Sequence, residues 1–238
     1  MKLISDLHTH TLASGHAFGT IRENAQAAAE RGLPILGISE HAPGIPGTCD
    51  PIYFWNLRCV PKELFGVRIL HGSEINVLEG GWLSLEDKYI ERLDYAIAGI
   101  HTMCYANQGA EGNTKNVIGC MEANKKVRFI SHPDDSRTPF DYDLLARGAR
   151  DNNVALELNN SSLVPPSSRQ NARENYRDML ACCEKYRVNV IINSDAHDPS
   201  AVGIFDHAIA LVKEYGFDES LIINTDEEKL KRFILGGD

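Results

Sequence analysis

The chain has 238 residues, of which 43% are hydrophobic and 24% are charged. This composition is typical of a folded globular protein, and it excludes a disordered chain, a collagen-like chain and a small disulfide scaffold. The formal net charge of −9 disfavours non-specific binding to nucleic acid, because that binding depends on lysine and arginine side chains that contact phosphates.

Short apolar runs alternate with helical patterns along the chain. We predict strands at residues 3–7, 35–39, 67–73, 95–100, 127–131, 154–158 and 188–193. These runs are nearly continuously apolar, as in parallel strands that are covered on both faces. Helical patterns follow at residues 20–31, 86–93, 117–124, 141–152, 172–186, 200–215 and 226–235. This alternation predicts an α/β fold with one parallel sheet or barrel, and the length predicts a single domain over residues 1–238.

Two segments are predicted to be loops. Residues 42–60 contain several prolines and glycines before the sequence Tyr53-Phe54-Trp55. These aromatic side chains either pack on the body of the protein or form a lid over a site, and we favour packing. Residues 107–113 are polar, contain glycine and form the second predicted loop.

The positions of the histidines carry the functional argument. Eight imidazole or carboxylate residues follow or end predicted strands: His8, His10, His41, Glu74, His101, His132, Asp195 and His197. In parallel α/β folds the carboxyl ends of the strands converge on one face, where active sites are built. We therefore expect these side chains to meet at one site.

The other three histidines are interpreted differently. His71 lies three residues before Glu74, so in a regular strand the two side chains point to opposite faces. His207 lies inside a helical pattern and is expected to have no role in the site. His16 lies in a loop, and spacing alone does not decide its role.

The expected ligands are too numerous for one four-coordinate ion, which indicates a site with several metal ions. Nitrogen and carboxylate ligands suit zinc, manganese or iron. Such cations lower the pKa of water and stabilise charge on oxygen, which are the roles that metals play in phosphoester hydrolysis.

Six motifs in chain order resemble those of the PHP (polymerase and histidinol phosphatase) superfamily, and the resemblance covers residues 2 to about 235. The motifs are Asp6-Leu7-His8-Thr9-His10, Ser39-Glu40-His41, Gly72-Ser73-Glu74, Ala98-Gly99-Ile100-His101, Ile130-Ser131-His132-Pro133 and Asn193-Ser194-Asp195-Ala196-His197. Residues 156–162 and the short length are similar to the stand-alone bacterial phosphatase branch, which holds three zinc ions. The resemblance implies a distorted, TIM-like (β/α)7 barrel with the metals at the C-terminal ends of the strands.

The resemblance also implies a ligand set of three divalent ions, with zinc favoured and manganese or iron as alternatives. The implied ligands are His8, His10, Glu74 and Asp195 for the first ion, His16, His41 and His197 for the second, and Glu74, His101 and His132 for the third. Many relatives have aspartate where this chain has Glu40, which is not an implied ligand.

From this resemblance we expect hydrolysis of a small phosphomonoester by a metal-bridging hydroxide. Arg137, five residues after His132, is a candidate clamp for the phosphate, or else a solvated loop residue. Asp134 and Asp135 tune that loop or protonate the leaving group, or else are plain loop acids, which is the interpretation we favour. Asn159 and Asn160 either bond substrate or a metal ligand, or form a turn.

Two other functions remain open at this stage. One is an amidohydrolase-type metal enzyme, which also uses a barrel mouth and metal-activated water. The other is a non-catalytic, metal-binding PHP module. We expect no membrane segment, because no apolar run reaches the roughly 18–20 residues that a membrane helix needs. We expect a cytoplasmic protein, because the six cysteines include no C-x-x-C pair and are typical of reduced thiols. The oligomeric state is not predicted.

Overall fold

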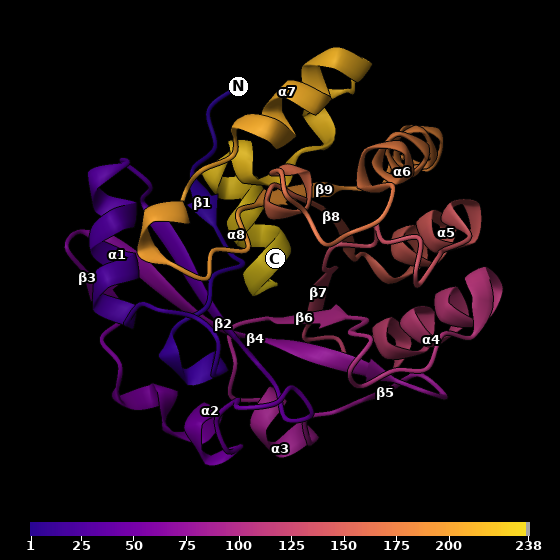
Figure 1. The fold of residues 1–238 in the computed structure, drawn as a ribbon. Helices are drawn as coiled ribbons and strands as arrows, with labels where there is room; N and C mark the ends of the chain where they lie inside the picture. The colour runs from indigo at the N-terminus through magenta and orange to yellow at the C-terminus, as the bar shows by residue number, and fades with distance from the viewer. Residues whose placement is uncertain (237–238) are drawn as a thin grey trace.

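The computed structural model describes residues 1–236. Its main sheet follows the order β1-β2-β4-β6-β7-β8-β9, and all neighbours on this path are parallel. These strands are β1 (Ser5–Asp6), β2 (Ile35–His41), β4 (Val67–Leu78), β6 (Ala96–Gly99), β7 (Val127–Ile130), β8 (Ala155–Asn159) and β9 (Val190–Asn193). Figure 1 shows them arranged as a ring with helices on the outside.

The ring is nearly closed between β1 and β9. No continuous ladder joins these two strands in the described residues, but a parallel bridge pairs Thr9 with Ala196 just beyond them. The backbone N–H of Leu7 also donates to Oδ1 of Asn193 at 2.9 Å. The predicted distorted, seven-stranded parallel barrel is therefore confirmed.

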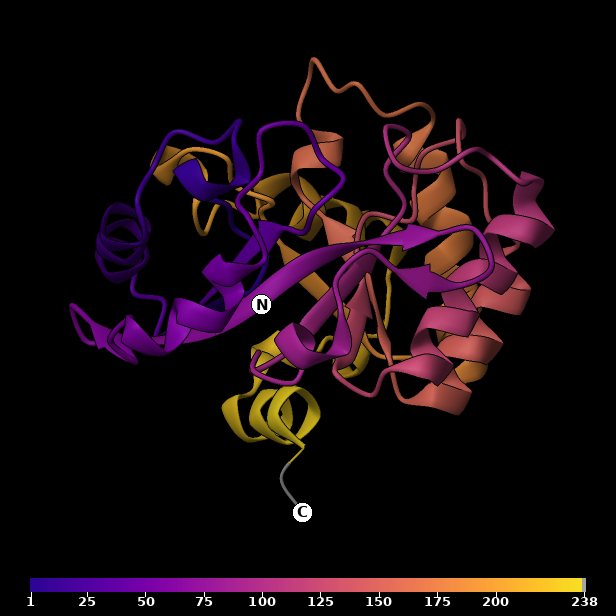
Figure 2. The ribbon, with the colours of Figure 1, turned by 90° about the horizontal axis from the view of Figure 1, so that it is seen from below.

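The helices lie outside the barrel or cover the end at which its strands begin. They are α1 (Ile21–Glu30), α2 (Ile52–Asn56), α3 (Asp87–Ile90), α4 (Gly109–Ala123), α5 (Tyr142–Asn152), α6 (Ala172–Tyr186), α7 (Asp206–Tyr215) and α8 (Glu227–Leu235). Figure 2 shows α8, in yellow, at one end of the molecule. Its buried residues Leu230 and Phe233 belong to one apolar cluster with Ile35 and Leu70, near the amino ends of their strands. Helix α8 therefore closes the end of the barrel opposite the predicted site.

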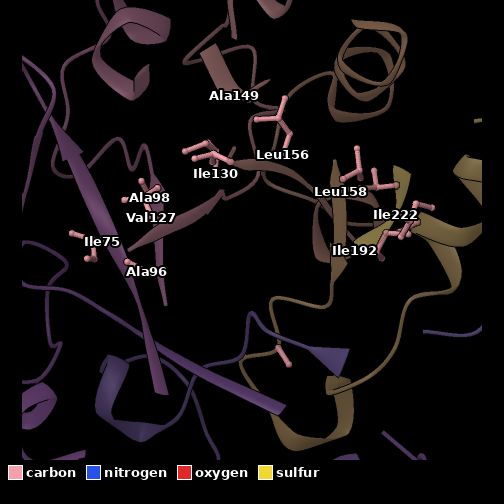
Figure 3. Packing of buried hydrophobic residues seen from close by; sticks show 14 of the residues in the cluster. Ile75, Ala96, Ala98, Val127, Ile130, Ala149, Leu156, Leu158, Ile192 and Ile222 are labelled. Atoms are coloured by element: carbon pink, nitrogen blue, oxygen red, sulfur yellow. The ribbon is translucent and has the colours of Figure 1, made fainter. Parts of the chain in front are cut away.

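The strands separate two apolar clusters because alternate side chains point to opposite faces. Ile97 and Ile191 point inward, where Tyr95 stacks near Phe129 with the ring centroids 6.0 Å apart. The second cluster lies between the strands and the helices, and Figure 3 shows residues from it such as Ala98. This alternation is what aims every second residue of a strand into the barrel.

Strand β4 is longer than predicted and shows the alternation most clearly. Leu70 belongs to the inner cluster, whereas Ile69 and Ile75 belong to the outer one. Glu74 therefore points inward and His71 outward, as their spacing predicts. The strand continues to Leu78 and pairs there with β5 (Trp82–Leu83), so Glu74 does not lie at its end. A further short strand, β3 (Glu63–Leu64), pairs with the start of β4.

Three sequence-based predictions for other segments were wrong. Residues 42–60 are not entirely loop, because α2 forms there and buries Phe54 to 1% exposure. Residues 109–113 begin α4, and the side chain of Asn113 stabilises this start by accepting from the N–H of Gln108 at 2.8 Å. The single helix predicted at 200–215 is divided into a 3-10 turn and α7, because Gly203 adopts a φ of 74° between them.

Six 3-10 turns connect the larger elements: η1 (Leu12–Ser14), η2 (Leu57–Cys59), η3 (Ser161–Leu163), η4 (Pro199–Ala201), η5 (Glu219–Leu221) and η6 (Ile223–Thr225). Across residues 1–236, none of the helices combines the length and the apolar character needed to span a membrane.

Candidate metal centre

The nine implied ligand residues meet at the carboxyl end of the barrel. His8 and His10 follow β1, His41 ends β2, and Glu74 points inward from β4. The residues that follow β6, β7 and β9 complete the cluster together with a loop residue: His101, His132, Asp195, His197 and His16. The geometry therefore brings together residues that lie almost 190 positions apart in the chain.

Glu74 lies at the centre of this cluster and is fully buried. Its Oε1 atom lies 2.7 Å from Nε2 of His132 and 3.2 Å from Nε2 of His101. Its Oε2 atom lies 3.0 Å from Nδ1 of His41 and 3.3 Å from Nε2 of His8. Burial alone would raise the pKa of this carboxyl, but the surrounding imidazoles hold the pKa well below its usual range.

Asp195 supplies a second carboxylate from the opposite side. Its Oδ1 atom lies 3.3 Å from Nε2 of His10 and 3.5 Å from Nε2 of His8. Nε2 of His197 lies 3.2 Å from Nε2 of His16, which joins the loop histidine to the cluster. Asp195 and His132 also have positive φ angles, 56° and 32°. This backbone region costs about 1–3 kcal/mol for a residue other than glycine and is often found at functional sites.

Most imidazoles of the cluster are oriented by a hydrogen bond at Nδ1. Acceptors lie 2.8–3.1 Å from Nδ1 of five histidines: Glu157 for His8, the Ser14 hydroxyl for His10, the Ser14 carbonyl for His16, Asn76 for His101 and the Asp195 carbonyl for His197. These bonds hold each ring with Nε2 directed at the cluster. Metal-binding histidines are held in the same way by a bond at the other nitrogen.

Several of the inward-facing atoms are buried and have no hydrogen-bond partner. They are Nε2 of His8, His10 and His101, Nδ1 of His41 and Oε2 of Glu74. A buried polar atom without a partner costs about 1–3 kcal/mol, so five in one place require an explanation. Bound cations provide one, because the same atoms belong to triads of ligand atoms that lie within 4.8 Å of one another. The donor set fits zinc, manganese or iron.

Glu157 is a part of the site to which sequence analysis assigned no role. It lies on β8, is fully buried and points into the barrel beside the inner-cluster residue Ala155. Its carboxylate accepts from Nδ1 of His8 at 2.8 Å and from the backbone N–H of His132 at 2.9 Å. A carboxylate inside the apolar run 154–158 is the sequence signal that could have revealed it.

Arg169 was also missed, and no sequence signal marked it. It lies in the loop between η3 and α6, and its side chain is 20% exposed. Nη1 lies 3.7 Å from Oδ1 of Asp134. Burial lowers the pKa of this guanidinium, but Asp134, Asp195 and Glu74 raise it above its usual value. The guanidinium is therefore a positive charge near enough to the carboxylates of the cluster for them to raise its pKa.

The residues after His132 have separate roles in the loop. Asp134 is buried, and this burial raises the pKa of its carboxyl to about 6. Asp135 accepts from Nε of Arg137 at 2.9 and 3.1 Å, so the predicted phosphate clamp already has a carboxylate partner. The Arg137 side chain is 42% exposed, twice as much as that of Arg169.

Asn159 and Glu40 also support the site, whereas the side-chain hydrogen bond of Asn160 lies outside it. Nδ2 of Asn159 donates to Oδ2 of Asp195 at 3.1 Å, so this residue orients an implied ligand. Asn160 instead accepts from the N–H of Ala208 near the start of α7. Glu40 accepts from the hydroxyl of Ser14 at 2.6 Å and thereby fixes the partner of His10.

The histidines that were given no role lie away from the cluster. Nδ1 of His71 lies 3.3 Å from Nζ of Lys62 on the outer side of β4, and His207 is exposed on α7. The aromatic residues of α2 pack on the body of the protein, as favoured from the sequence. Phe54 is buried, and Trp55 lies beneath the guanidinium of Arg92 at 3.5 Å.

Comparisons with known proteins agree with this architecture. The PHP domain family matches residues 6–226. A probable phosphatase of Clostridium botulinum is 37% identical over 235 residues, which is 98% of this chain and 95% of that protein. A probable phosphatase of Acetivibrio thermocellus is 36% identical over 98% of this chain and 96% of its own length.

Among solved structures, histidinol phosphate phosphatase from Lactococcus lactis, complexed with zinc, L-histidinol and phosphate, has a similar fold. The TM-score is 0.62 at 16% identity, over 90% of this chain and 94% of that one. Dihydropyrimidinase from Brevibacillus agri shares the fold with a TM-score of 0.52 at 11% identity, over 97% of this chain and 70% of that one.

Proposed function

The chain belongs to the PHP domain family, and from this premise we propose that it is a phosphatase that hydrolyses a small phosphomonoester at a centre of three divalent cations. The observation that carries the proposal is the set of buried, unpartnered imidazole and carboxylate atoms that face one another around Glu74. Such a set is stable when cations replace the missing hydrogen-bond partners.

We assign the ions as follows, with zinc preferred over manganese or iron. The first would be held by His8, His10, Glu74 and Asp195, the second by His16, His41 and His197, and the third by Glu74, His101 and His132. Bound there, the cations would neutralise charge on phosphoryl oxygens and lower the pKa of water. Hydrolysis breaks the bond between phosphorus and the alcohol oxygen, forms a bond from phosphorus to the oxygen of water, and transfers a proton to the alcohol.

The protein's own residues contribute orientation and charge. Glu157 holds His8 and the backbone of His132, so it fixes the geometry of two proposed ligands from β8. Asn159 does the same for Asp195. Because these partners are themselves buried, the cluster is held in place before any substrate binds.

We propose Arg169 as the main clamp on a phosphoryl oxygen. Asp195 and Glu74 of the cluster act on the charge of its guanidinium, and its partner Asp134 lies 3.7 Å away, beyond hydrogen-bond distance. Arg137 is the weaker candidate, because Asp135 already occupies its guanidinium. A partly exposed guanidinium near the site also favours an anionic phosphate ester over the neutral amide of an amidohydrolase substrate.

The experiment combines metal content with turnover. Purified protein is analysed for metals and assayed on p-nitrophenyl phosphate before and after chelation. His10→Ala and Asp195→Ala are compared with His207→Ala, which changes a histidine outside the cluster. We expect about three ions per chain, loss of turnover on chelation and at least a hundredfold loss of kcat/KM in the two cluster variants. Full turnover in the chelated protein, or in both variants, would refute the proposal.

A further inference from the structure

A cavity of about 600 Å³ opens beside the candidate metal centre. Asp195 and His197 of the centre line one part of it. The side chains of Phe18, Val164 and Ile204 line another part. Cavities of this size are typical of sites for small organic molecules. Anything held at the centre therefore has adjoining space for the rest of the molecule.

The apolar part of the lining is exposed to solvent. Phe18 is 75% exposed and Val164 is 39% exposed. The two residues come from different loops, one after β1 and the other after β8, and Ile204 comes from a third loop before α7. Exposed apolar side chains that gather in a concave site beside polar groups mark a surface that a ligand covers.

The charges around the cavity restrict the kind of ligand. Among the described residues that line it there is no lysine and no arginine, and Asp198 adds a carboxylate to that of Asp195. A second phosphate or carboxylate on the substrate would find no lysine or arginine partner among these residues and would lie near the carboxylate of Asp198. An uncharged ring, in contrast, would pack against the side chains of Phe18 and Val164.

We infer that the alcohol part of the substrate carries an uncharged aromatic or heteroaromatic ring, which binds in this cavity against Phe18 and Val164. This inference rests on the proposed phosphatase function, with the phosphoryl group at the metal centre. It names the substrate class as ring-bearing phosphomonoesters, in preference to bisphosphates and phosphates of small polyols.

Hydrolysis of a matched pair of esters tests the inference. 2-Phenylethyl phosphate and ethyl phosphate both release a primary alcohol, so the difference in kcat/KM between them reports the ring and not the leaving group. We expect at least a tenfold preference for 2-phenylethyl phosphate, since burial of one ring accounts for about that factor. Phe18→Ala should lose roughly fivefold to tenfold on this ester alone.

The control is Phe65→Ala, which removes another phenylalanine that is 51% exposed but lies in the turn between β3 and β4. It should leave both esters unchanged. Phe18→Ala keeps the backbone bond from its N–H to the carbonyl of His197, so the metal centre should keep its ions. Inhibition by inorganic phosphate, which has no ring, should likewise be the same in wild type and Phe18→Ala.

Binding provides a readout that does not depend on turnover. Calorimetry on the metal-loaded protein should find benzylphosphonate bound at least fivefold more tightly than methylphosphonate, and Phe18→Ala should remove that difference. If both esters are hydrolysed equally well and both phosphonates bind equally well, the ring-binding inference is wrong while the phosphatase function stands. If neither ester is hydrolysed by metal-loaded protein, the phosphatase function is refuted, and the substrate class is refuted with it.

Discussion

Nδ1 of His8 lies 2.8 Å from Oε1 of Glu157, and both side chains are completely buried. Because a carboxylate only accepts, Nδ1 carries a proton and Nε2 is the nitrogen that faces Glu74 and Asp195. Oε1 of Glu157 also accepts from Nδ2 of Asn193 at 2.9 Å. One carboxylate on β8 therefore sets the orientation of a proposed ligand on the far side of the β1–β9 junction.

Replacing Glu157 tests this arrangement. Glu157→Gln keeps the shape but removes the charge that fixes His8, so metal affinity should fall by about 10- to 100-fold. Competition with a chromogenic chelator measures the metal dissociation constant. Glu111→Gln is the control, since Glu111 forms an exposed ion pair with Lys115 and should behave as wild type. An unchanged metal dissociation constant in Glu157→Gln would mean that His8 is oriented by other contacts.

Arg169 and Arg137 should differ when each is replaced by methionine. Arg169→Met removes a hydrogen-bonding charge at the proposed phosphate position, so kcat/KM should fall by about 10- to 100-fold, mainly through a higher KM. Arg137→Met should change kcat/KM less than about threefold, since its guanidinium is paired with Asp135. Steady-state kinetics and metal analysis of both variants check this. The reverse order of effects would assign the clamp to Arg137.

The sequence was sufficient to predict the barrel and the meeting of eight residues, whereas only the family resemblance placed His16 with them. Most of the eight come at or just after an apolar strand, so parallel pairing brings residues such as His41 and His132 together. The two-residue alternation of side chains along a strand also predicted correctly that Glu74 and His71 point to opposite faces. These signals are local in the sequence, and they predict the folded arrangement because the sheet is regular.

What the sequence could not predict depends on contacts between distant segments. Arg169 is placed by the loop 164–171, where the carbonyl of Gln170 accepts from the N–H of Ser136 at 3.0 Å. The start of α4 depends on Asn113, whose Nδ2 also donates to the carbonyl of Pro139. Neither contact has a periodic pattern or a fixed spacing, so sequence analysis assigned no role to Arg169 and predicted a loop at residues 107–113.

His71 should make the stability of the protein sensitive to acid. Burial, and then the charge of Lys62, lower the pKa of this imidazole to about 4 from its usual 6.5. The unfolded chain therefore binds a proton between these values that the folded chain does not, and stability decreases as the pH falls through this window. Above pH 6.5 the full stability is present. We expect a loss on the order of 1–2 kcal/mol from this group between pH 7 and pH 5.

Denaturant unfolding at pH 7 and pH 5 measures the effect. Between pH 7 and pH 5, the free energy of unfolding should decrease less in His71→Gln than in wild type. The difference should equal the loss expected from His71, because glutamine does not titrate. His207→Gln, which changes an exposed histidine on α7, should lose as much as wild type. Equal pH dependence in wild type and His71→Gln would assign the acid sensitivity to other groups.

Gly99 on β6 leaves room for the carboxylate at the centre of the site. A Cβ atom there would lie 2.2 Å from Oγ of Ser131 and 3.0 Å from Oε1 of Glu74. Ser131 donates to that same oxygen at 2.7 Å, so Gly99→Ala should displace both side chains. We expect a loss of about 1–3 kcal/mol in the free energy of unfolding, together with a lower metal content. Adding Ser131→Ala removes the nearest obstructing atom and should recover part of the stability, which thermal unfolding of the single and double variants measures. Wild-type stability and metal content in Gly99→Ala would show that the barrel adjusts at β6 without moving Glu74.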